Sequence, residues 1–159
     1  MVAVDSSEQM VEHARETLGD RALVMHSDLT ELELDEQVDA VFSNAVFHWV
    51  RDQDRLFERM YAALRPGGKL VAGCGAPGNL ERFLGLVAEV SREAPYSEYL
   101  AAFEPGWRFH GAEETEARLR AVGFTDATVE IDAVEELPED PAGYAMAGTE
   151  RGASGQPAA

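Results

Sequence analysis

Asp5, Asp28 and Asn44 each follow closely after a short apolar run in this chain. Their side chains offer carboxylate and amide groups, which bind hydroxyls, amines and other polar ligand atoms. In an open α/β sheet, ligands bind beyond the carboxyl ends of the strands. If the apolar runs are parallel strands, these side chains gather at one edge of a sheet and form a ligand site.

The two carboxylates each have a functional and a structural interpretation. Asp5 lies between an apolar run and a helical pattern, so it can accept hydrogen bonds from the paired hydroxyls of a ribose, or cap that helix beside Ser6. Asp28 can accept from an exocyclic amine such as that of adenine, or serve as a solvated turn residue. Met10, one helical turn beyond Asp5, can cover a flat ring or belong to the core.

Phe47, His48 and Trp49 form an unusual run beyond the third apolar segment. These rings can floor a pocket or cap the core, and His48 can act as a base or be structural. The histidines and the one cysteine, Cys74, lack the spacing of metal ligands, so no metal site is predicted. No phosphate-binding loop and no Gly-x-Gly-x-x-Gly motif is present.

The apolar runs alternate with amphipathic stretches, which is typical of a parallel sheet covered by helices on both faces. Ser6 and Gln9 have the spacing of a capping box for the first helix. Residues 127–133 alternate apolar and polar side chains, which predicts a half-exposed strand at the sheet margin. The expected strands are residues 2–4, 22–25, 38–42 and 70–74, and the expected helices are residues 7–18, 53–64, 80–90 and 113–122.

Bulk composition indicates one domain in a reducing compartment. The 159 residues suffice for a single core, and one cysteine rules out a disulfide framework and favours the cytoplasm. The net charge of −17 argues against nucleic acid as a partner, because Lys and Arg must neutralise phosphates. No apolar run approaches the length of a membrane span, so no membrane partner is expected.

Taken together, five segments resemble the class I S-adenosylmethionine-dependent methyltransferases, and their trans-aconitate methyltransferase branch in particular. The resemblance covers about residues 2–145, and five motifs in the right order are far more specific than any one of them. These segments are residues 4–10, 27–29, 42–50, 64–70 and 106–124.

The resemblance implies that the cofactor is S-adenosylmethionine and gives its loops roles. Asp5, with Ser6 beside it, would hold the ribose hydroxyls, and Met10 would pack on the adenine. Asp28 would accept from the adenine amine, with the backbone of Leu29 beside it.

The resemblance also implies where the methyl group is transferred. Asn44 and Ala45 would lie near the methionine end of the cofactor, and His48 and Trp49 would be the catalytic residues facing the methyl and its acceptor. An anionic acceptor would be bound by the residues nearest these loops, because arginine clamps carboxylates with two hydrogen bonds. These substrate-binding residues are Arg51, Trp107 and Arg108.

The sequence departs from the family pattern at both ends. The family's first strand and its glycine-rich loop have no counterpart here, and its last antiparallel strand, expected after Gly148, is replaced by residues 149–159. We therefore expect an incomplete Rossmann-like sheet, a partial methyltransferase domain at residues 1–148 and a disordered tail at residues 149–159. A monomer, or a dimer through exposed sheet edges, is expected.

The expected function is methyl transfer from S-adenosylmethionine to a small molecule, with a carboxylate as one acceptor. One alternative is a truncated Rossmann-like domain without catalytic activity. Another is an NAD-dependent oxidoreductase, which also has an acidic residue after its second strand. That class does not explain residues 44–49 or 64–68.

Overall fold

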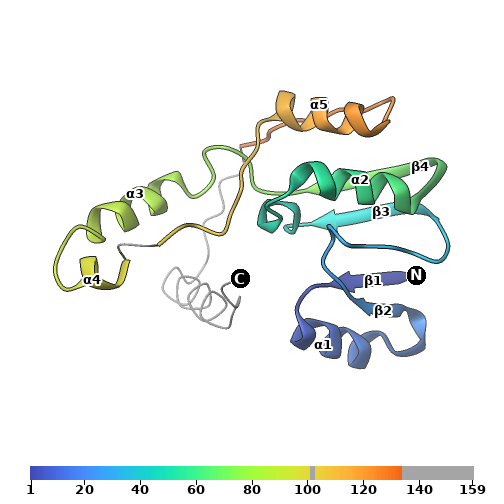
Figure 1. Cartoon of the computed structure of the whole chain (residues 1–159), viewed down its shortest axis with the longest axis horizontal. Helices are drawn as coiled ribbons and strands as arrows, with labels where there is room; N and C mark the ends of the chain where they lie inside the picture. The colour runs from blue at the N-terminus through green and yellow to red at the C-terminus, as the bar shows by residue number, and fades with distance from the viewer. Residues whose placement is uncertain (101–102, 134–159) are drawn as a thin grey trace.

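The computed structural model describes residues 1–100 and 103–133 (Figure 1). The proposed tail at residues 149–159 lies outside the described residues. The elements, in chain order, are β1 (Val2–Asp5), α1 (Glu8–Leu18), η1 (Gly19–Arg21), β2 (Leu23–His26), β3 (Val38–Asn44), η2 (Phe47–Trp49), α2 (Gln53–Ala63), β4 (Leu64–Gly73), α3 (Glu81–Val90), α4 (Tyr96–Leu100) and α5 (Ala112–Val122).

The strands form two parallel pairs, β1 with β2 and β3 with β4. Asp5 at the end of β1 is in register with His26 at the end of β2, and Asn44 is in register with Gly73. In Figure 1, β1 and β3 point the same way, so their carboxyl ends lie on one side of the molecule. This confirms the predicted parallel α/β arrangement and the common placement of the candidate loops.

One core joins the two strand pairs. Its centre is the apolar stripe of α2, where Leu56 and Met60 are almost fully buried, together with Leu32, Phe47 and Phe57. The side chains packed against this centre come from all four strands, from loops and from α5, namely Val4, Leu29, Met25, Leu34, Val41, Val50, Leu70, Leu119 and Val122. Burial of this surface therefore holds β1 and β2 beside β3 and β4.

Helices cover both faces of the β1–β2 pair. Met25 faces the core beneath α2, and its neighbour Val24, which is also buried, must face the other way because strand side chains alternate. Helix α1 contacts β1 and β2, and its Val11 is buried. On the β3–β4 pair, by contrast, Phe42 is 79% exposed.

Most predicted helix ends are confirmed, with one shift. Asp52 caps α2 by accepting from the Arg55 amide, and Gly19 and Gly123 end α1 and α5 in positive-φ conformations. The predicted cap at Ser6 is wrong: Ser7 is the N-cap of α1, and its hydroxyl accepts from the Met10 amide. The carboxylate of Asp5 binds the Ser7 amide, which places the helix start one residue later.

Three other predictions need correction. Residues 65–68, which lie between the expected helix 53–64 and the expected strand 70–74, are a bulge within β4, because Val38 pairs with Leu64 and Ala40 with Lys69. Residues 127–133 form no strand, although their apolar and polar residues alternate. The expected helix start at residue 80 is wrong by one residue, because Leu80 stands before α3 with a positive φ. Helices α3 and α4 extend away from the strands (Figure 1).

Candidate functional site

The two predicted cofactor carboxylates are anchored in turns at neighbouring strand ends. Oδ1 of Asp5 accepts from the Ser7 amide at 2.8 Å. Oδ1 of Asp28 accepts from the amide and the hydroxyl of Thr30, both at 2.7 Å. Asp5 thus bonds the backbone at the start of α1, and Asp28 bonds its own turn, as the structural interpretations of these residues predicted. Among the described residues the second oxygen of each carboxylate has no hydrogen-bond partner, so a ligand role is compatible with it.

Hydrogen bonds also tie these two loops to each other. The Ser27 amide donates to the Asp5 carbonyl at 3.1 Å, and Nε2 of His26 lies 2.9 Å from the Ser6 carbonyl oxygen. Met10 is 51% exposed on the first turn of α1, so it is not the core methionine of the alternative interpretation. The loops after β1 and β2 therefore form one surface with an exposed thioether beside it.

At the end of β3, Asn44 and Ala45 lie close to the backbone of β4. The Ala45 amide donates to the Gly73 carbonyl at 2.7 Å, and Ala45 adopts a φ of 57°. A Cβ on residue 73 would lie 3.1 Å from Oδ1 of Asn44, so the Asn44 side chain lies against the backbone of β4. The strained Ala45 backbone turns the chain sharply into η2.

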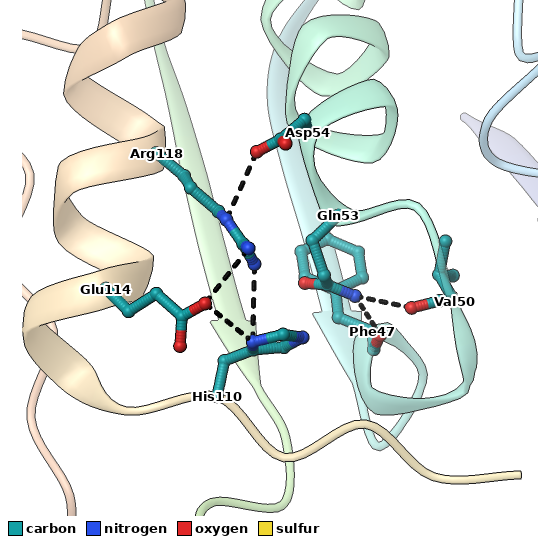
Figure 2. Close-up of polar contacts among 7 residues, drawn as sticks. All are labelled: Phe47, Val50, Gln53, Asp54, His110, Glu114 and Arg118. Atoms are coloured by element: carbon teal, nitrogen blue, oxygen red, sulfur yellow. Dashed lines mark hydrogen bonds and ion pairs between the residues drawn. The ribbon is translucent and has the colours of Figure 1, made fainter.

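A buried glutamine holds the turn that carries His48 and Trp49. Gln53 is 7% exposed, and its Nε2 donates to the carbonyls of Phe47 and Val50, both at 2.7 Å (Figure 2). The sequence analysis did not single out Gln53. A signal was available, because this polar residue stands on the same helical stripe as Phe57 and Met60.

His48 is held from three directions. The Gly75 amide donates to its Nδ1 at 3.1 Å, and the Arg108 amide donates to its carbonyl at 2.7 Å. The ring of Phe109 lies 5.8 Å away between centroids. Partial burial lowers the pKa of His48 below its ordinary value, because desolvation disfavours the imidazolium. The ring is therefore neutral near pH 7.

Aromatic rings connect η2 with residues 105–109. Trp49 and Trp107 lie 5.4 Å apart, and Trp107 stacks nearly parallel with Phe109 at 6.5 Å. The structure thus brings together His48, Trp49, Trp107 and Arg108, which come from two segments about sixty residues apart. Arg51 is exposed, and no contact joins it to this group within the described residues.

An ion-pair cluster fixes α5 beside α2 (Figure 2). The Arg118 guanidinium lies 3.1 Å from Asp54 and 2.9 Å from Glu114. Nδ1 of His110 is 3.2 Å from the same Glu114 oxygen and 3.3 Å from Arg118. This cluster anchors residue 110, and with it the preceding segment that carries Trp107 and Arg108.

A cavity of about 560 Å³ borders part of this group. His48, Gly75, Arg108 and His110 are among its lining residues, together with residues of β4, α2, α5 and 124–130. Cys74 also lines it, and partial burial raises the pKa of its thiol. Among the described residues, the predicted cofactor ligands Asp5, Met10, Asp28 and Asn44 do not line this cavity, whereas the predicted catalytic His48 and the predicted substrate-binding Arg108 do.

Residues 1–100 and 103–133 hold neither a metal-ligand cluster nor a helix that could span a membrane. No group of three or more His, Cys, Asp or Glu side chains there has the arrangement of a metal site. None of the helices described is long and apolar enough to cross a bilayer.

The amino-acid sequence is similar to those of known methyltransferases. Residues 1–72 match the family described as "Methyltransferase domain". The trans-aconitate 2-methyltransferase of Variovorax paradoxus is 35% identical over 99 residues, which are 62% of this chain and 38% of that protein. The chain therefore spans well under two thirds of that curated relative.

Solved structures agree on the fold. A methyltransferase from Thermotoga maritima is 26% identical with a TM-score of 0.54, over 79% of this chain and 55% of that one. A Haemonchus contortus N-methyltransferase solved with S-adenosylhomocysteine is 26% identical with a TM-score of 0.55, over 79% of this chain and 28% of that one. These matches do not favour the NAD-dependent alternative. Residues 1–72 thus match the methyltransferase-domain family, and the chain has the fold of a class I S-adenosylmethionine-dependent methyltransferase.

Proposed function

We propose that this protein transfers a methyl group from S-adenosylmethionine to a small carboxylic acid. The observation that carries the cofactor part is the pair of anchored carboxylates, Asp5 and Asp28, at the ends of two strands in register. The family match over the same residues supports it. A cytoplasmic setting, and a monomer or a dimer through exposed sheet edges, belong to the same proposal.

The cofactor is bound by the loops after β1, β2 and β3. Asp5, with Ser6 beside it, binds the ribose hydroxyls through its second oxygen, and Asp28 accepts from the adenine amine beside the backbone of Leu29. The exposed side chain of Met10 covers one face of the adenine. The residues nearest the sulfonium are those at the end of β3, Asn44 and Ala45.

The acceptor is bound by the group around η2. His48 and Trp49 face the reacting atoms, and Trp107 and Arg108 close the site from the other segment. Arg108 borders the cavity, where a guanidinium can bind a carboxylate. Arg51, which is exposed, attracts the same anion from outside.

The chemistry needs alignment more than proton transfer. A carboxylate oxygen attacks the methyl carbon, the carbon–sulfur bond breaks, and its electron pair neutralises the sulfonium. The products are a methyl ester and S-adenosylhomocysteine, and no proton moves. Holding the two reactants in line can supply about 7–11 kcal/mol of the barrier reduction.

The cofactor part is tested by titrating S-adenosylhomocysteine into the chain by calorimetry. We expect binding that weakens about 10- to 100-fold in Asp5→Ala, since a hydrogen bond to a charged group contributes about 1.5–3 kcal/mol. Asp5→Asn separates the two roles of this residue, because its amide oxygen can still accept from Ser7. Glu16→Ala, an exposed acid on α1, is the matched control. A folded chain that binds no S-adenosylhomocysteine, or binds it equally well in Asp5→Ala, contradicts the proposal.

A further inference from the structure

One hydrogen bond decides which nitrogen of His48 carries a proton. The Gly75 amide is a donor, and it lies 3.1 Å from Nδ1 of His48. Nδ1 must therefore offer its lone pair. A neutral imidazole has one protonated and one unprotonated nitrogen, so the proton of His48 is on Nε2.

The surroundings of His48 make it costly to move the proton from Nε2 to Nδ1. Moving the proton to Nδ1 would place two N–H groups against each other and leave the Gly75 amide without its partner. The loop cannot easily shift to relieve this, because a Cβ at residue 75 would lie 2.5 Å from Cε1 of Phe109. The Arg108 amide holds the His48 backbone from the other side at 2.7 Å.

Nε2 of His48 is available to a ligand. No hydrogen bond joins it to any other described residue, and the ring lines the 560 Å³ cavity beside Arg108. A protonated Nε2 donates a hydrogen bond and cannot accept a proton. An acceptor oxygen that carries negative charge is the best partner for such a donor.

We infer that His48 positions a carboxylate acceptor by donating a hydrogen bond from Nε2, and that it does not act as a general base. This inference rests on the proposed function and deepens it by giving His48 a positioning role toward the carboxylate acceptor. Hydroxyl and amine acceptors must lose a proton during methyl transfer, and the one lone pair of this ring, on Nδ1, already accepts from the Gly75 amide. A carboxylate is already ionised, so it needs only orientation.

The tautomer can be measured without any methyl transfer. In the ¹⁵N-histidine-labelled full chain, two-bond ¹H–¹⁵N spectra distinguish a protonated from an unprotonated ring nitrogen. We expect a protonated Nε2 and an unprotonated Nδ1 for His48 at neutral pH. The opposite tautomer would overturn the inference, even if S-adenosylhomocysteine binds as proposed.

The donor role is tested with a carboxylate probe. We expect succinate, but not neutral dimethyl succinate, to shift the Nε2 resonance of His48. His48→Gln places an amide N–H near the position of Nε2 and should keep succinate affinity within about threefold, whereas His48→Leu should weaken it at least about tenfold. Equal weakening in both variants, or no Nε2 shift with succinate, would contradict the donor role. Circular dichroism of both variants confirms that they fold.

Discussion

At the scale of single residues, His48 is the side chain whose protonation is most directly tied to folding. Its pKa in the folded chain lies below the ordinary value of 6.5, because desolvation disfavours the charged ring. The unfolded chain therefore binds more protons than the folded chain as the pH falls through this range. The contribution of His48 to stability is present above pH 6.5 and is lost as the pH falls through its folded pKa.

Urea unfolding at pH values from 8 to 5 measures this dependence. We expect the free energy of unfolding to fall less steeply with decreasing pH in His48→Gln than in the parent chain, because Gln does not titrate. His13→Gln, at an exposed position on α1, is the control. Identical slopes in the parent and His48→Gln would show that the folded ring titrates at its ordinary value.

Residues with local roles were easier to predict than residues with distant partners. Asp5 and Asp28 were placed correctly at strand ends because a carboxylate after an apolar run is visible in the sequence. The contact between Gly75 and His48 was not predicted, because it joins residues 27 positions apart and depends on the register of β3 with β4. Gln53 was missed because its partners are backbone carbonyls, which a sequence pattern does not show.

At the scale of elements, Gln53 makes α2 and η2 one rigid unit. We expect Gln53→Leu to destabilise the chain by about 2 kcal/mol, because the Val50 carbonyl loses the Gln53 donor and the Phe47 carbonyl keeps only the Val50 amide as a donor. Chemical denaturation measures the change, and the exposed Gln9→Leu is the matched control. A loss of less than about 0.5 kcal/mol would mean that water replaces the amide at both carbonyls.

Residues 127–133 alternate apolar and polar side chains, which predicted a strand, but the structure has no strand there. A strand requires a neighbouring backbone with which to pair, and periodicity cannot supply one. In the structure, residues 127–130 face β4 across the cavity and are not paired with it. The helices were predicted better, because their backbone hydrogen bonds are local and their caps stand in the sequence, as at Asp52 and Gly123.

At the scale of the whole molecule, burial is uneven across the two faces of β3 and β4. Phe57 is 3% exposed on the buried side of α2, whereas Phe42 is 79% exposed on β3, in register with the exposed Val71. We expect Phe57→Ala to cost about 3–5 kcal/mol of stability and Phe42→Ala less than about 1 kcal/mol. Thermal unfolding of both variants measures the difference. Comparable losses would show that Phe42 is covered in solution.

The overall class of the fold was predictable because apolar strands alternating with amphipathic helices leave few other arrangements. The separation of the cofactor loops from the cavity was not predictable. It depends on how α5 and residues 105–110 pack beside α2, through the ion pairs of Arg118.

The most direct test of the cofactor site is a crystal structure of the chain with S-adenosylhomocysteine. We expect the ribose hydroxyls within hydrogen-bond distance of Asp5, the adenine amine at Asp28 and the adenine ring against Met10. A ligand bound instead in the cavity lined by His110 and β4 would contradict this assignment, because those residues belong to the acceptor side of the proposed site.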